Sequence, residues 1–189
     1  MHEKLLPLLL AGIAAPAMTQ TIPPQIAAEQ VMSEPNNSGY ALGQHGNGNF
    51  KFAQTFQLPR AGAVTHIMLP IYCSTAQTVR VTVQATLRTG LPSGIVLATQ
   101  DVPGYAMNSW MAGNGMMSMR MVEFEQPRPL QAGNYAFTVE AIGGECTFLP
   151  GPASDTYAGG QAFIINGISL LSWYAWGRDL AFQVFERPR

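Results

Sequence analysis

The chain alternates apolar and polar residues most regularly between Thr78 and Arg88. Five apolar side chains occupy every second position of this segment, namely Val79, Val81, Val83, Ala85 and Leu87. The residues between them are threonine, arginine or glutamine. A period of two places successive side chains on opposite faces of a β-strand. The segment is therefore predicted to form a strand with one face in the core and the other in water.

Shorter segments with the same character recur after residue 49. They are Phe52–Leu58, His66–Tyr72 with Cys73 next to it, Gly94–Asp101, Met119–Phe124, Tyr135–Ala141, Phe163–Ile165 and Asp179–Glu186. Turn-forming glycines and prolines separate these segments, as at Gly90–Gly94 and Pro127–Pro129. No helical apolar period follows the N-terminal segment, so the crossover helices of a parallel sheet are not expected. The pattern predicts an all-β fold, an antiparallel β-sandwich.

The first 17 residues have the features of a secretory signal peptide. A charged start precedes an apolar run from Leu5 to Ala14, and Ala15–Ala17 is typical of a cleavage site. A buried N-terminal helix is the alternative, but Pro7 interrupts the run. The run is shorter than the about 20 residues that a membrane-spanning helix needs, and the last residues of the chain are charged. We expect cleavage after Ala17 and a secreted protein, extracellular or periplasmic, without membrane insertion.

The remaining chain divides into two parts by composition. Residues 18–49 are rich in proline, glycine and asparagine and are predicted to form a polar lead-in with little regular structure. Within it, Gln25–Met32 is compatible with a short helical turn. Residues 50–189 are the predicted β-sandwich domain.

Charge and cysteine content narrow the classes of function. The formal net charge is -1, only 11% of residues are charged, and the arginines are scattered, so no basic stripe for nucleic acid exists. Cys73 and Cys146 are the two cysteines. In an oxidising compartment they most simply form a disulfide, which stabilises the fold by about 4 kcal/mol on the chain-entropy model. Two free thiols are the alternative, and a metal site lacks a C-x-x-C pair.

Several short motifs occur in an order that resembles a module of bacterial extracellular proteins. They are Ala53–Phe56, Gly90–Ala98, Pro129–Tyr135, Tyr157–Ala162 and Asp179–Phe182. Together they resemble choice-of-anchor-type domains, over residues 50 to 186. The resemblance implies a jelly-roll-like β-sandwich akin to carbohydrate-binding modules. It implies no defined active site, since Gly94 and Gly133 lie where turns need glycine.

Aromatic residues supply the candidate binding site. Flat rings can stack on the apolar faces of sugars while polar neighbours bind hydroxyl groups. Trp173, Trp176 and Arg178 combine both elements, with Tyr157 nearby and Trp110 in a loop. The alternative is that the rings close one end of the core, because aromatics bury the most apolar surface. We expect Trp173 in the core, and Trp176 and Trp110 exposed.

Other candidate chemistry is weaker. Six methionines between Met107 and Met121 offer soft ligands for Cu(I), but packing in the core or a partner-binding surface explains them more simply. Calcium is compatible with oxygen atoms of the Asn36–Asn37 loop and Asp155, although no loop has calcium-ligand spacing. Glu123 and Glu125 share a strand face and are expected to be exposed, and no G-x-S-x-G elbow exists, so no enzyme or cofactor is predicted.

The sequence thus favours a secreted, non-catalytic binding module, with a polysaccharide or surface glycan as its partner. The alternative is a structural or adhesive protein of the cell surface or matrix that self-associates through an apolar patch around Met111–Met121. The two hypotheses differ in where Trp110, Tyr157 and Trp176 lie.

Overall fold

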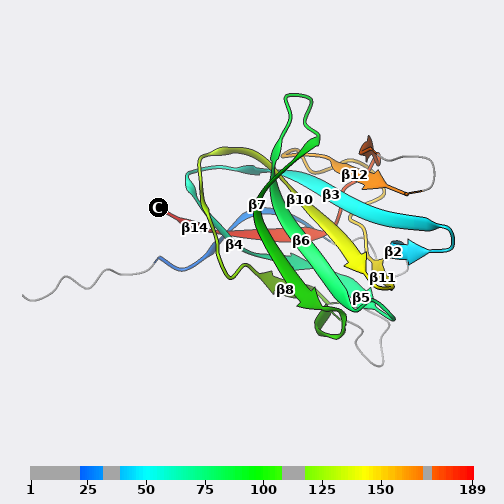
Figure 1. Ribbon diagram of the computed structural model, residues 1–189. Coiled ribbons are helices and arrows are strands. Elements are labelled where there is room, and N and C mark those ends of the chain that lie inside the picture. The colour runs from blue at the N-terminus through cyan, green and yellow to red at the C-terminus, as the bar shows by residue number, and fades with distance from the viewer. Residues whose placement is uncertain (1–21, 32–38, 108–117, 168–171) are drawn as a thin grey trace, which may run out of the picture.

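A computed structural model describes residues 22–31, 39–107, 118–167 and 172–189. The described residues form antiparallel β-strands in two sheets and one short 3-10 helix, Gly104–Met107. Figure 1 shows β3, β10, β6 and β7 side by side, with β14 and β4 crossing behind them. The predicted antiparallel β-sandwich is confirmed. The predicted signal peptide, residues 1–17, lies outside the described residues.

The smaller sheet has the order β1-β14-β4-β8, with β9 also paired to β4. Its strands are β1 (Gln25–Gln30), β4 (Gly62–Leu69), β8 (Arg120–Glu123), β9 (Pro129–Leu130) and β14 (Phe182–Pro188). β14 therefore pairs on both sides, with β1 and with β4.

The larger sheet has the order β5-β11-β2-β3-β10-β6-β7, and β12 pairs with both β3 and β13. Its strands are β2 (Tyr40–His45), β3 (Gly48–Leu58), β5 (Ile71–Cys73), β6 (Thr78–Thr86), β7 (Pro92–Pro103), β10 (Gly133–Ile142), β11 (Glu145–Phe148), β12 (Ala162–Ile165) and β13 (Tyr174–Ala175). β3 is long enough to pair with β2 near its start and with β12 further on.

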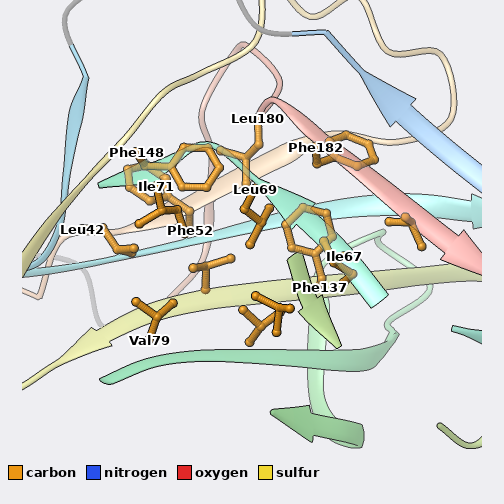
Figure 2. Packing of buried hydrophobic residues seen from close by; sticks show 14 of the residues in the cluster. Leu42, Phe52, Ile67, Leu69, Ile71, Val79, Phe137, Phe148, Leu180 and Phe182 are labelled. Carbon is orange, nitrogen blue, oxygen red and sulfur yellow. The ribbon is translucent and has the colours of Figure 1, made fainter. Parts of the chain in front are cut away.

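The core lies between the two sheets. Phe52 and Phe137 from the larger sheet pack toward Ile67 and Phe182 from the smaller sheet (Figure 2). The alternation in the Thr78–Arg88 segment is confirmed for the valines of β6, which are all fully buried. Thr82 and Gln84 on the opposite face are buried as well, and Leu87 lies beyond the strand and is exposed, contrary to the prediction. Arg80 lies on the opposite face and keeps contact with water. The pattern of apolar residues thus determines which face of this strand enters the core.

The predicted strand from His66 to Cys73 is divided in two at Pro70. β4 belongs to the smaller sheet and β5 to the larger sheet, although their buried side chains follow one period of two. Proline has no N–H for a strand ladder, so pairing ends there, while the Pro70 carbonyl accepts a hydrogen bond from the Leu149 N–H at 3.1 Å. The chain passes from one layer of the sandwich to the other at this residue.

The lead-in contains more regular structure than its composition predicts. Gln25–Gln30 forms strand β1, so the helical turn expected there is wrong, and Tyr40–His45 forms β2. β1 pairs with β14, and β2 pairs with β11 and β3. β14 and β11 come from distant parts of the chain, whereas β3 follows β2 directly across the two-residue turn Gly46–Asn47. Both strands belong to the sheets of the sandwich.

Cys73 and Cys146 form a disulfide bond, as predicted. The two residues lie opposite each other in the pairing of β5 with β11, and both are buried. The bond therefore joins neighbouring strands at one end of the larger sheet. The two cysteines are 73 residues apart in the sequence, so the bond closes a long loop and strongly reduces the conformational entropy of the unfolded chain.

Candidate functional site

The two described tryptophans lie on either side of β13 and have opposite surroundings. β13 pairs with β12, which in turn pairs with the central strand β3. Trp176 packs against the core, whereas Trp173 lines a hollow on the outer face of the larger sheet. Both are half-buried. The expectation of a core Trp173 and an exposed Trp176 is therefore wrong. The side on which each ring lies depends on how β13, which lies between them, pairs beside β12.

Trp176 belongs to an aromatic cluster that closes one end of the core. Its ring centroid lies 4.7 Å from that of Tyr40, edge to face, and 5.2 Å from that of Phe52. The Arg178 guanidinium lies 5.3 Å from the Trp176 ring centroid. Such packing accounts for Trp176 structurally. We call Tyr40, Phe52, Trp176, Arg178 and Asp179 the Trp176 anchor.

Arg178 is occupied by interactions within the protein. Its Nη1 donates to the Tyr40 hydroxyl at 3.0 Å, and its Nη2 donates to the Gly151 carbonyl at 2.6 Å. Charge-assisted hydrogen bonds to a carbonyl are stronger than neutral ones. Arg178 therefore holds the segment around Gly151 against β2, and both of its Nη atoms have partners within the protein.

Asp179 fixes the loop that carries Tyr157. Its fully buried carboxylate accepts hydrogen bonds from the Tyr157 N–H at 2.8 Å, the Thr156 N–H at 2.9 Å and the Gln54 Nε2 at 3.0 Å. Gln54 Oε1 in turn accepts from the Leu180 N–H at 2.9 Å. The buried Asp179 carboxylate and the Gln54 side-chain amide thus both have hydrogen-bond partners. No local sequence pattern indicates the role of Gln54, which lies buried on the core side of β3.

Tyr157 packs into the same loop as a structural residue. Its ring meets Phe182 edge to face, with centroids 5.2 Å apart. Burial raises the pKa of the Tyr157 hydroxyl above its usual value. Burial and the neighbouring Asp179 raise the pKa of the Asp155 carboxyl above its usual value. Tyr157 and Trp176 contact different core residues and form no shared platform, while Trp110 lies outside the described residues.

The hollow beside Trp173 is the strongest candidate site. Its volume is about 390 Å³, and it lies over β3, β10, β6 and β7 on the face that is turned away from the core. We call it the outer hollow. Its lining combines one aromatic residue, three aliphatic residues and seven polar or charged residues: Lys51, Arg80, Thr82, Gln84, Val96, Thr99, Thr138, Val139, Glu140, Ile165 and Trp173.

A row of charges crosses the sheet at one side of the outer hollow. Glu140 lies opposite Lys51 on β3 and opposite Arg80 on β6, and it forms ion pairs with both. Arg80 lies opposite Asp101 and donates to it from Nε and Nη2, each at 2.7 Å. These hydrogen bonds lower the pKa of Asp101 and raise that of Arg80. Four side chains from four strands are thereby held in fixed positions.

Hydroxyl and amide groups form the floor beside this row. The Thr82 and Thr138 hydroxyls hydrogen-bond across strands at 2.7 Å, and Gln84 Nε2 donates to Thr82 at 2.9 Å. Gln84 Oε1 accepts from the Gly94 N–H at 3.0 Å. Gly94 has a φ of 80°, which favours glycine, and it lies where β7 departs from regular pairing with β6. The hydrogen bond from Gly94 to Gln84 thus holds the start of β7 beside the floor of the hollow.

The sequence pattern predicts the strand that supplies part of this site but not the site itself. The polar residues of the Thr78–Arg88 alternation were expected to face water, and three of them line the outer hollow. Their partners Glu140 and Lys51 come from strands whose register only the fold reveals. The spacing of these residues in the sequence does not indicate that they become neighbours.

Metal-binding chemistry has little support among the described residues. No group of three histidine, cysteine, aspartate or glutamate side chains gathers there. The Asn36–Asn37 loop considered for calcium lies outside the described residues, as do Met111, Met116 and Met117. Of the other methionines in that segment, Met107 is buried, Met119 is half-buried and Met121 is exposed.

Comparison with protein families and with curated proteins identifies no relative. No protein-family model matches the chain, and no curated protein is significantly similar to it. The resemblance to choice-of-anchor-type domains stays a prediction from short motifs. Within the part of the chain that the structure describes, no helix has the length and apolar character needed to cross a membrane.

Proposed function

We propose that this protein is a secreted, non-catalytic module that binds glycans in the outer hollow. The observation that carries the proposal is the position of Trp173 beside a floor of hydroxyl and amide groups on one sheet face. An aromatic ring contacts the apolar face of a sugar, and fixed polar groups bind its hydroxyls. The motifs that resemble extracellular carbohydrate-binding modules support the same class of ligand.

The polar groups of the hollow are held in place before any ligand arrives. Thr82, Thr138 and Gln84 hydrogen-bond to one another, and Arg80 is clamped by Asp101. Binding then orders few side chains, so less free energy is lost on complex formation. Lone pairs of both hydroxyls and N–H groups of Arg80 and Lys51 are the groups available to sugar hydroxyls.

The test is binding to a panel of polysaccharides by affinity electrophoresis, followed by titration calorimetry. We expect Trp173→Ala to abolish binding and Trp173→Phe to weaken it. Tyr105→Ala is the matched control, because Tyr105 is 82% exposed and does not line the hollow. Failure of the wild-type protein to bind any polysaccharide would contradict the proposal, as would unchanged binding in Trp173→Ala.

Secretion is part of the proposal and has its own test. A disulfide between Cys73 and Cys146 is typical of oxidising compartments. Residues 1–17 have the composition of a signal peptide. Mass spectrometry of the protein from culture fluid or periplasm should give a chain that begins at Met18. A cell-retained chain that keeps these residues would contradict it.

A second candidate is a structural or adhesive protein that self-associates through the outer face of the smaller sheet. Met121 and Ile26 are 53% and 47% exposed there, and Phe185 stacks on His66 with centroids 4.1 Å apart. A second copy of this chain is the proposed occupant. Light scattering should then show a dimer that Met121→Glu dissociates, whereas a monomer at every concentration would exclude it.

A further inference from the structure

The outer hollow continues into two further hollows. One, of about 360 Å³, shares Val96 and Thr99 with it and reaches the loop from Glu125 to Arg128. The other, of about 380 Å³, shares Glu140 with it and reaches Gln44 on β2. Shared lining residues make the three hollows neighbours on the surface. We call the three together the track.

The track is longer than a single sugar. It crosses β7, β6, β10 and β3, and neighbouring strands lie about 4.8 Å apart, so the crossing alone covers roughly 14 Å. Beyond β3 and β10 it continues to the turn at Gly143 and Gly144. Trp173 lies at the middle hollow, with a hollow on each side. A ligand at Trp173 can therefore extend in two directions.

The charges along the track balance. Three cationic side chains, Lys51, Arg80 and Arg128, lie along it. Three carboxylates offset them, since Glu125 and Glu140 line the track and Asp101 is bonded to Arg80. An acidic chain of uronates would meet as much repulsion as attraction here. The balance favours a ligand without charge.

We propose that the ligand is a neutral, linear polysaccharide whose internal residues lie along the track. This inference rests on the proposed glycan-binding function and specifies its ligand. Trp173 contacts one internal sugar, and the groups around Gln44 and around Arg128 contact sugars on either side of it.

Titration calorimetry with defined oligosaccharides tests the inference. The probes are tri- and hexasaccharides of β-1,4-glucose, β-1,4-xylose, β-1,3-glucose and β-1,4-mannose, with polygalacturonate and alginate as acidic chains. We expect one neutral series to bind, with an affinity at least about tenfold higher for the hexasaccharide than for the trisaccharide. The acidic chains should not bind at physiological salt.

Variants at the ends of the track sharpen the result. Gln44→Ala should lower hexasaccharide affinity several-fold and leave trisaccharide affinity unchanged. Gln183→Ala is the matched control, because Gln183 lies on the outer face of the smaller sheet. Equal affinity for both lengths, or binding of acidic chains alone, would overturn the inference while leaving glycan binding intact. No binding to any probe or polysaccharide would overturn the proposed function itself.

Discussion

The outer hollow and the Trp176 anchor contain the same kinds of residue and differ in what those residues contact. In the anchor, Trp176 packs against Phe52, and Arg178 bonds to Tyr40 and Gly151. In the hollow, Trp173 faces a surface cavity, and Arg80 bonds to other surface side chains. An aromatic next to an arginine is therefore no sign of a binding site by itself. The face of the sheet decides whether the pair packs against the core or lines a surface cavity.

The two tryptophans give the largest expected difference. We expect Trp176→Ala to lower the free energy of unfolding by about 3 kcal/mol, because it removes a ring from the core boundary. Trp173→Ala should cost at most about 1 kcal/mol, since its ring borders a cavity that water can fill. Chemical denaturation of both variants measures this. Equal costs would show that the two environments do not differ as described.

Arg178 and Arg80 extend the comparison to the charged residues. Arg178→Ala removes two hydrogen bonds at a half-buried site and should cost about 2 kcal/mol. Arg80→Ala removes exposed ion pairs and should cost less than about 1 kcal/mol. Denaturation at low and high salt separates them, since only the Arg80 effect should shrink with added salt. A salt-sensitive Arg178 effect would contradict the assignment.

The loop that Asp179 of the anchor holds should make stability depend on pH. The pKa of Asp155 is raised in the folded protein, so the folded state holds this proton more tightly than the unfolded state. Stability from this group is therefore lost as pH rises above the unfolded pKa of 3.8 and through the higher folded pKa. Asp155→Asn should raise the Tm at pH 7, within about 2 °C, and the difference should vanish toward pH 3. A lower Tm at pH 7 would contradict the sign.

The hydroxyl floor gives the smallest expected change in stability. The double variant Thr82→Val and Thr138→Val replaces two bonded hydroxyls by methyl groups of similar shape, so stability should change by less than about 1 kcal/mol. Glycan binding should nevertheless be lost, because these oxygens are proposed ligand contacts. Calorimetry with the polysaccharide that the wild type binds provides the readout. If binding is retained, the ligand contacts another part of the hollow than these two hydroxyls.

The sequence predicted the strands in which apolar and polar residues alternate. β6 and β10 are examples, because their buried valines mark the core face whichever strands they pair with. The pairing of Cys73 with Cys146 was predictable because few alternatives exist for two cysteines. β1 was missed because its partner β14 lies far along the chain, whereas β2 also forms a hairpin with β3 through Gly46 and Asn47, which is a local turn signal.

The candidate site was predicted less well than the fold. The aromatic residues were found, but the side on which each ring lies follows from how β13 crosses beside β12. Lys51 and Glu140 become neighbours only through the register of β3 with β10. The division of one apolar repeat at Pro70 has a local signal in the proline itself, which cannot donate to a strand ladder. Long-range register, rather than local pattern, determines the chemistry of the hollow.

The double pairing of β14 has a consequence for how the chain folds. β14 lies between β1 and β4, so the smaller sheet has no central strand until residues 182–188 are in place. During synthesis, β1 stays unpaired until its partner β14 is made more than 150 residues later. Contacts of such long range close slowly, on the scale of milliseconds to seconds. Folding of this sandwich is therefore expected to complete only near the end of synthesis, with the edge of β4 exposed until then.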